Sequence, residues 1–320
     1  MHLLSLENVS KTYHTRKYLW SPVKKKKAVA DVSLKLEMGK CLGLVGESGC
    51  GKSTLARLIT GLEVPSSGEI KFKNTNIAEL QKKGRLDVRK DMQLVFQDCY
   101  SSVNPRYTAE KVLLEPLRNF LQLTADEEKE RVQELLELVD LHREDKHKFS
   151  HQFSGGQLQR LCIARALAVM PKMIVLDEPT SSLDVSIQAQ ILNLLADLKE
   201  QFQLSYLLIS HDLEAVYYLA DALAVMYRGT IVEIIEDIHI FDQLKHPYTK
   251  MILDSVPSYA SRKNHFFTQT VDRNSYAEDE MKGCVFAHRC DTSSKKCHEE
   301  KPELKAVSLN HSIACHSCIQ

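Results

Sequence analysis

The sequence predicts an α/β fold with a mainly parallel sheet, because apolar strands alternate with helical segments along most of its 320 residues. Continuous apolar runs are typical of strands that are buried on both faces of such a sheet. The chain has four of them: Cys41–Val45, Met92–Phe96, Met173–Leu176 and Tyr206–Ile209. A change to mostly helical character between about residues 99 and 170 indicates a helical subdomain inserted into the sheet domain.

The N-terminal part is predicted to contain two half-buried strands, since Leu4–Val9 and Val32–Leu36 alternate apolar with polar residues. Residues from about 14 to 27 form an insertion between them and include four consecutive lysines. A solvated loop is the preferred interpretation of these lysines, with a contact to lipid headgroups or phosphates as the alternative. A helix is expected from Ser53 to Leu62, where Gly61 ends it.

Later elements follow the same rules. Ala125–Leu141 and Val185–Phe202 carry apolar residues at helical spacing, and Ala222–Met226 and Ile231–Val232 are strands joined by a turn. Residues from about 258 to 282 are polar and lack periodicity, which indicates a linker or a surface loop. We therefore expect a large domain over residues 1–257 and a small, cysteine-rich C-terminal extension over residues 258–320.

Composition and charge exclude several function classes. The 42 Lys and Arg residues balance the 42 Asp and Glu residues, so no overall field attracts nucleic acid, and no nucleic-acid partner is expected. No stretch approaches the ~18 to 20 apolar residues that span a bilayer, and the N-terminus lacks the features of a signal peptide. The expectation is a cytoplasmic chain whose connection to a membrane comes through a partner.

A phosphate-binding loop is predicted at residues 46–53, which match G-x-x-x-x-G-K-[ST] between a strand and a helix. Glycines let backbone amides converge on phosphate oxygens, and the helix N-terminus adds favourable partial charge. Lys52 is expected to bridge the β- and γ-phosphates, and the Ser53 hydroxyl to complete a Mg²⁺ shell. The residues assigned to ATP here are Gly46, Glu47, Ser48, Gly49, Cys50, Gly51, Lys52, Ser53 and Thr54.

Two adjacent carboxylates end the apolar run at residues 173–176. Asp177 is placed to make the second acidic contact to Mg²⁺. Glu178 follows directly and is expected to polarise the attacking water. Carboxylates at a strand end are often only solvated charges, but the spacing of this pair from Ser154-Gly155-Gly156-Gln157 favours the functional interpretation.

Between these motifs, Phe153-Ser154-Gly155-Gly156-Gln157 resembles the signature of ABC transporter ATPases, in which one subunit's signature closes on the nucleotide held by another. The resemblance covers nearly the whole chain. It implies a P-loop ABC ATPase domain that works in pairs and hydrolyses ATP with Mg²⁺. It also implies that Ser154, Gly155, Gly156 and Gln157 contact nucleotide, Ser154 and Gly156 at the γ-phosphate of the opposite subunit. Phe153 stands where the family more often has leucine.

The same resemblance assigns three further residues. Gln97 matches the glutamine that senses Mg²⁺ and water near the permease, and Asp184 matches the loop that communicates across the dimer. His211 matches the switch histidine, which holds the γ-phosphate and orients the water. The resemblance therefore implies that Glu178, His211 and Gln97 carry the catalysis, and that Ser53, Gln97 and Asp177 hold Mg²⁺.

Adenine is held in this family by stacking on an aromatic residue near the first strand. Tyr13 is the best positional match, and the insertion offers Tyr18 and Trp20 as alternatives. Residues 96–106, 246–250 and 283–286 narrow the resemblance to the oligopeptide and dipeptide importers, whose relatives also serve nickel or metallophore uptake.

The implied partners are a paralogous ATPase subunit in a heterodimer, two membrane permease subunits and an extracytoplasmic solute-binding protein. Held by the permease, the chain is expected at the cytoplasmic face of the membrane. Two other classes compete with this interpretation: a soluble ABC ATPase acting on ribosomes or DNA, and a binding module with a decayed ATP site. The sequence has neither a second nucleotide domain nor a long coiled-coil insertion, and its ATP motifs are intact.

Five of the nine cysteines fall within residues 284–318, where uniform scatter would place about one. The spacing C-x5-C-x6-C-x17-C joins four of them: Cys284, Cys290, Cys297 and Cys315. Zinc sites usually start from closer pairs, so a [4Fe–4S] cluster is favoured, as the resemblance also implies, with zinc or free thiols as alternatives. Cys318, His311 and His316 are alternative ligands that leave the fourth position open.

Overall fold

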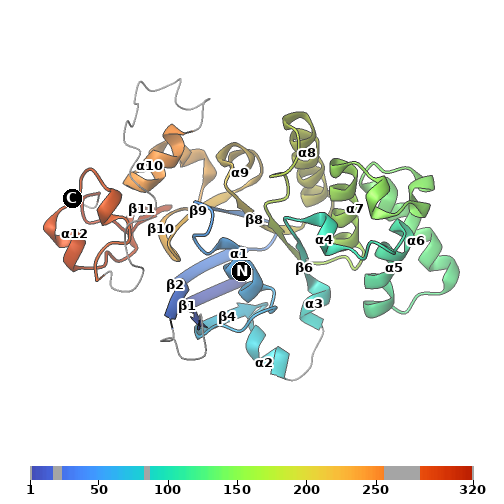
Figure 1. Cartoon of the computed structure of the whole chain (residues 1–320), viewed down its shortest axis with the longest axis horizontal. Helices are drawn as coiled ribbons and strands as arrows, with labels where there is room; N and C mark the ends of the chain where they lie inside the picture. The colour runs from blue at the N-terminus through green and yellow to red at the C-terminus, as the bar shows by residue number, and fades with distance from the viewer. Residues whose placement is uncertain (1, 17–23, 83–86, 256–281, 319–320) are drawn as a thin grey trace.

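The computed structural model describes residues 2–16, 24–82, 87–255 and 282–318 (Figure 1). Most of the predicted linker, the boundary expected at residue 257, Tyr18 and Trp20 lie outside these ranges. In the described part of the chain, no helix is both long and apolar enough to cross a membrane.

A central sheet of eight strands has the order β11-β12-β10-β9-β3-β8-β7-β6. Its parallel part confirms the apolar runs of the sequence and consists of β3 (Cys41–Val45), β6 (Met92–Val95), β7 (Met173–Asp177), β8 (Ser205–Ser210) and β9 (Ala222–Tyr227). Every residue of β3, β7 and β8 is buried, as expected for strands covered on both faces.

A second, antiparallel sheet has the order β2-β1-β4-β5. Its strands are β1 (His2–Thr15), β2 (Lys24–Glu37), β4 (Ser67–Phe72) and β5 (Thr75–Asn76). The expectation of a solvated loop at the four lysines is wrong, because Lys24–Lys27 begin β2 and Lys26 pairs with Tyr13. Lysine is a weak strand former in general, but β2 is an edge strand, where lysine side chains protect the exposed edge from further pairing.

Helices surround both sheets. Those of the N-terminal part are α1 (Lys52–Ile59), α2 (Ile77–Lys82) and α3 (Asp87–Asp91). Between residues 99 and 170 lie α4 (Cys99–Ser102), α5 (Ala109–Phe120), α6 (Ala125–Leu138), η1 (Arg143–His147), η2 (Ser150–Gln152) and α7 (Gly155–Leu167). Figure 1 shows α5, α6 and α7 gathered at one end of the molecule, beyond β6. The remaining helices before residue 256 are α8 (Val185–Phe202), α9 (Leu213–Leu219), η3 (Ile238–Gln243) and α10 (Pro247–Asp254).

Helix α6 illustrates how the sequence determines a boundary. The Thr124 hydroxyl accepts the backbone N–H of Glu127, and the Glu127 carboxylate accepts the backbone N–H of Thr124 at 2.7 Å, which is a capping box. Val132, Leu135 and Leu136 face the core, as their helical spacing predicts.

The described part of the C-terminal extension lies at the opposite end of the molecule from α6 (Figure 1) and joins the central sheet. Its elements are η4 (Ala287–Arg289), α12 (Lys295–Glu299), β11 (Lys305–Ser308) and β12 (His311–Ile313). Strand β12 pairs antiparallel with β10 (Thr230–Ile235), so the extension continues the sheet.

A fully buried contact fixes this junction, with His311 Nε2 within hydrogen-bond distance, 2.8 Å, of Glu233 Oε1. Burial alone would raise the pKa of the Glu233 carboxyl group. Hydrogen bonds from His311 and from the backbone N–H groups of Lys245 and His246 instead hold this pKa below its usual range. The buried carboxylate is thus satisfied from two segments, β12 and the turn at Lys245 and His246, which keeps β12 in place on β10.

Candidate functional site: a nucleotide pocket

Part of the predicted ATP site lines a cavity of about 550 Å³. Its lining residues are Tyr13, Lys26, Ala28, Ser48, Gly49, Gly51, Lys52, Ser53, Thr54, Gln97, Glu178 and His211. The structure therefore brings together most of the phosphate loop with residues that lie more than a hundred positions away. Neither Lys26 nor Ala28 was predicted to line the cavity, because the lysine run was interpreted as a solvated loop, with a contact to lipid headgroups or phosphates as the alternative, and Ala28 lies outside the predicted strands.

The phosphate loop joins β3 to α1, and its glycines are required by geometry. Gly51 has a φ of 114°, in the left-handed region, and a Cβ there would lie 2.2 Å from the carbonyl oxygen of Ala28. A side chain is excluded at this position both by the backbone conformation and by space. Gly51, Lys52 and Ser53, at the N-terminus of α1, line the cavity, and a helix N-terminus is a favourable place for phosphate oxygens.

Lys52 is the buried cation of this loop and the first residue of α1. Its Nζ donates hydrogen bonds to the carbonyl oxygens of Gly46 at 2.6 Å and Glu47 at 3.1 Å. The ammonium group thus lies inside the loop, where neutral carbonyls hold it without neutralising its charge. That charge remains available to phosphate oxygens entering the cavity.

Ser53 and Asp177 form the oxygen pair that Mg²⁺ requires. The Ser53 hydroxyl donates to Asp177 Oδ1 at 3.2 Å, and Asp177 ends β7 with only 8% of its surface exposed. Burial raises the pKa of Asp177, and the neighbouring Glu178 carboxylate raises it further, against the Ser53 hydrogen bond. A bound divalent cation would stabilise the charged carboxylate and so lower the pKa of Asp177 again. The oxygens of Ser53 and Asp177 therefore fit Mg²⁺ chemically.

Glu178 is the centre of a polar group at the end of β7. Its Oε2 accepts a hydrogen bond from Gln97 Nε2 at 2.9 Å and lies 3.3 Å from His211 Nδ1. The backbone of Glu178 has a φ of 48°, which is uncommon for a residue with a side chain, and its N–H is held by the carbonyl of Ile209 at 2.9 Å. Strained backbone of this kind is found at functional sites, and here it directs the carboxylate toward Gln97 and His211.

Tyr13 lies at the other side of the cavity, on β1. Its hydroxyl donates to Glu63 Oε2 at 2.6 Å, and burial, followed by this hydrogen bond, raises the pKa of the Tyr13 phenol. A tethered hydroxyl limits the rotation of the ring beside the phosphate loop. This position agrees with a stacking platform for a base, although the role itself stays a prediction.

The residues of the signature do not line this cavity. Ser154 caps α7, accepting the N–H of Gln157 at 3.3 Å, while Gln157 Oε1 accepts the N–H of Ser154 at 3.1 Å. A Cβ on Gly156 would lie 2.5 Å from Ile187 Cγ2, so α8 packs directly on this turn. Ser154 and Gly155 are exposed, and Asp184, which precedes α8, also lies outside the lining of the cavity. Within one chain, the signature is therefore not assembled with Lys52.

The described cysteines of the C-terminal extension, unlike the residues of the phosphate loop, are not brought together in the predicted site. Within the described ranges, all cysteines are free and no group of three or more His, Cys, Asp and Glu side chains is arranged to hold a metal ion. Burial raises the pKa of Cys284 to about 11, and the nearby thiols of Cys297, Cys315 and Cys290 add to the effect. A hydrogen bond from Cys318 lowers the pKa of Cys315 to about 6. The predicted iron–sulfur cluster, like the zinc alternative, is not supported by this arrangement.

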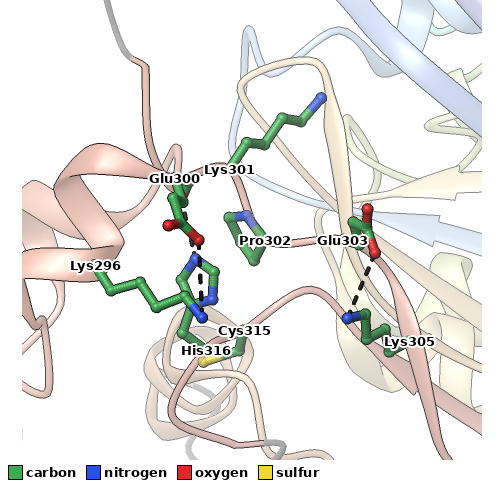
Figure 2. Close-up of a pocket in the computed structure, with 8 residues that line it drawn as sticks. All are labelled: Lys296, Glu300, Lys301, Pro302, Glu303, Lys305, Cys315 and His316. Carbon is green, nitrogen blue, oxygen red and sulfur yellow. Dashed lines mark hydrogen bonds and ion pairs between the residues drawn. The ribbon is translucent and has the colours of Figure 1, made fainter.

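The two histidines considered as alternative ligands have other partners. His311 bonds Glu233, as described above, and His316 Nε2 lies 3.0 Å from the carbonyl oxygen of Glu300. His316 and Cys315 line a second pocket, of about 390 Å³, in the extension (Figure 2). Lys296 pairs with Glu300 at 3.7 Å and Lys305 with Glu303 at 3.5 Å, while Lys301 pairs with Asp31 outside the pocket at 3.3 Å, so each lysine of the lining has a carboxylate partner.

Two residues beside the phosphate loop were missed by sequence reasoning. The Tyr248 hydroxyl accepts the backbone N–H of Glu47 at 2.8 Å, and Arg289 donates two hydrogen bonds to the Glu47 carboxylate. Tyr248 falls in the segment 246–250 that was noted only for its resemblance. No pattern in the sequence points to Arg289.

Comparison with known proteins agrees with this geometry. Residues 29–181 match the family model of the ABC transporter, and residues 232–297 match that of the oligopeptide/dipeptide transporter C-terminal region. The oligopeptide transport ATP-binding protein AppF of Bacillus subtilis is 43% identical, covering 98% of this chain and 97% of its own. The dipeptide transport ATP-binding protein DppF of Haemophilus influenzae is 41% identical, covering 98% and 96%.

A solved structure shows the same fold. It is an ATP-binding cassette dimer in a post-hydrolysis state, bound to ADP and phosphate, with a TM-score of 0.64 and 29% identity. The match covers 71% of this chain and 96% of that one. The P-loop ABC ATPase fold predicted from the sequence is thereby confirmed. The chain belongs to the ABC transporter family, as an ATPase that carries the C-terminal region of the oligopeptide/dipeptide transporters.

Proposed function

We propose that this chain hydrolyses ATP to drive the import of oligopeptides or dipeptides through a membrane permease. The observation that carries the proposal is the meeting of Gln97, Glu178 and His211 at the edge of a cavity that is also lined by most of the phosphate loop. The match of residues 232–297 to the oligopeptide/dipeptide transporter C-terminal region supports the class of solute. Import of nickel or a metallophore is the alternative for the same machine.

Each residue of the site has a separate role in the proposed reaction. Lys52 and the amides of the phosphate loop bind the β- and γ-phosphates, and Tyr13 supports the adenine. Ser53, Asp177 and Gln97 would hold Mg²⁺, which neutralises charge on the phosphate oxygens. Glu178 accepts a hydrogen bond from water and orients it for attack, because its carboxylate lies at the cavity beside Gln97 and His211.

We further propose that two such subunits act together on two permease subunits at the cytoplasmic face of the membrane, fed by an extracytoplasmic solute-binding protein. Ser154 and Gly155 are exposed, so a second ATPase, a paralogue in our proposal, can present its nucleotide to them. Asp184 would communicate across the same interface. Co-purification of membrane subunits with the tagged chain tests this assembly against a soluble ABC ATPase, which would be recovered without them.

Lys52→Ala is expected to weaken binding of ATP at least ~tenfold, because the buried positive charge on the phosphates is lost. Titration of the purified full chain with a fluorescent ATP analogue measures this change. Lys25→Ala is the matched control, since Lys25 is an exposed lysine of β2 that does not line the cavity. An unchanged dissociation constant for Lys52→Ala would contradict the assignment of the phosphate loop.

We also keep the metal site as a proposal for Cys284, Cys290, Cys297 and Cys315. It is supported by their C-x5-C-x6-C-x17-C spacing. Anaerobically purified protein should be brown, with absorption near ~400 nm and about four irons per chain for a [4Fe–4S] cluster, or colourless with about one zinc. Cys315→Ser should lose the metal, whereas the matched variant Cys318→Ser should retain it. Finding neither metal would leave free thiols and withdraw the site.

A further inference from the structure

The C-terminal extension makes a direct ionic contact with the phosphate loop. Arg289, the last residue of η4, donates from Nη1 to Glu47 Oε2 and from Nη2 to Glu47 Oε1, both at 2.9 Å. Two parallel hydrogen bonds between a guanidinium and a carboxylate fix orientation as well as distance. The pair joins residues that are 242 positions apart in the sequence.

Aromatic packing limits the freedom of this guanidinium. Its Cζ lies 5.7 Å from the ring centroid of Tyr227, at the end of β9, and 5.7 Å from that of Phe286 in the extension. Nη1 also donates to the Tyr227 hydroxyl at 3.3 Å. The two rings are themselves packed edge to face, 5.3 Å between centroids. Arg289 is therefore held in place before it meets Glu47, unlike a lysine or arginine on an open surface.

Glu47 is also held at its backbone. Its N–H donates to the hydroxyl of Tyr248, a fully buried residue of α10, at 2.8 Å. Its carbonyl oxygen accepts hydrogen bonds from Lys52 Nζ at 3.1 Å and from the N–H of Cys50 at 3.2 Å. The residue that Arg289 anchors thus also contacts the cation of the phosphate loop.

The segment that carries Arg289 is held by backbone hydrogen bonds. The Cys284 N–H donates to the carbonyl of Cys297 at 2.7 Å, and the Arg289 N–H donates to that of Phe286 at 3.0 Å. A Cβ on Gly283 would lie 2.2 Å from the carbonyl oxygen of Cys297, so the two backbone segments are packed too closely for a side chain at the start of this turn. Pairing of β12 with β10 fixes the rest of the extension to the sheet.

We propose that Arg289 is a positioning residue for nucleotide binding, which holds Glu47, and with it the phosphate loop, in the shape that receives nucleotide. The C-terminal extension then contributes to nucleotide affinity without touching the nucleotide. This inference rests on the proposed function of the loop around Lys52. The Lys52→Ala titration described above tests that function separately.

Arg289→Ala is expected to raise the dissociation constant for a fluorescent ATP analogue about tenfold in the full chain. In the assembled transporter, KM for ATP should rise by a similar factor while kcat at saturating ATP stays within about twofold of the parent. Arg289→Lys keeps the charge but not the two-pronged geometry, so it should give an intermediate value. Glu47→Gln should match Arg289→Ala, and the double variant should be no weaker than either single one.

The matched control is Lys301→Ala. Lys301 Nζ lies 3.3 Å from Asp31 Oδ2, so this pair also joins the extension to the main domain, but at an exposed site away from the phosphate loop. It should leave affinity at the parent value. The inference is overturned if Arg289→Ala binds like the parent, if Lys301→Ala weakens binding equally, or if the Glu47 and Arg289 effects simply add. If Arg289→Ala unfolds, Arg289→Lys and Glu47→Gln carry the same test.

Discussion

Glu178→Gln is expected to lower ATP turnover by the assembled transporter at least ~tenfold while ATP binding stays near the parent value. The neutral amide keeps the size of the side chain, but it cannot polarise water as a carboxylate does. The carboxylate is also the acceptor for the Gln97 amide and the neighbour of His211, so the substitution removes the negative charge around which that group is arranged. Phosphate release in the assembly and nucleotide titration of the isolated chain measure the two effects separately.

Glu200→Gln provides a matched control, because Glu200 is an exposed carboxylate near the end of α8 that does not line the cavity. It should hydrolyse ATP like the parent. Turnover near the parent rate in Glu178→Gln would remove Glu178 from the role of orienting water. Lost nucleotide binding in the same variant would instead assign Glu178 to the binding of ATP.

The local part of the fold could be predicted from the sequence because its signals are local. Strands β3, β7 and β8 are buried on both faces, and their sequences are therefore nearly continuous apolar runs. The phosphate loop is specified by glycines whose backbone angles and space exclude other residues, as at Gly51. Helix α8 begins and ends where the sequence predicts, at Val185 and Phe202.

The start of β2 and strands β11 and β12 could not be predicted, because they depend on contacts between segments that leave no periodic pattern in the sequence. The lysines at the start of β2 have low strand propensity, and only pairing with β1 makes them a strand. Strands β11 and β12 are four and three residues long and are stabilised by β10 and by the buried Glu233–His311 pair. Such short elements carry too few residues for a periodic pattern.

Some residues of the site could likewise be predicted from the sequence and others could not. Residues within a motif, such as Lys52, were recognisable, whereas Tyr248 and Arg289 reach Glu47 across roughly two hundred positions or more. A tyrosine or an arginine in a loop has many possible roles, and only the fold selects one of them. The same reason explains why spacing alone could not decide how the cysteines of the extension are used.

Ser154→Arg is expected to abolish ATP hydrolysis in the assembly while nucleotide still binds to the phosphate loop of the same chain. Ser154 is exposed at the N-terminus of α7 and lies outside the lining of the cavity that contains Lys52. A long cation there would obstruct the nucleotide of an opposing subunit. The isolated chain should accordingly hydrolyse ATP slowly and gain activity when its partner ATPase and permease are added.

The substitution also removes a helix cap, which costs about 1 kcal/mol of stability, and this effect needs its own control. Thr124→Arg removes the equivalent cap from α6, whose first turn does not line the cavity. It should lower the unfolding temperature by a similar amount and leave hydrolysis intact. Equal losses of activity in both variants would attribute the Ser154 effect to folding. Full activity from a preparation shown to be monomeric would contradict the paired site, because Lys52 and Ser154 would then not need two chains to meet.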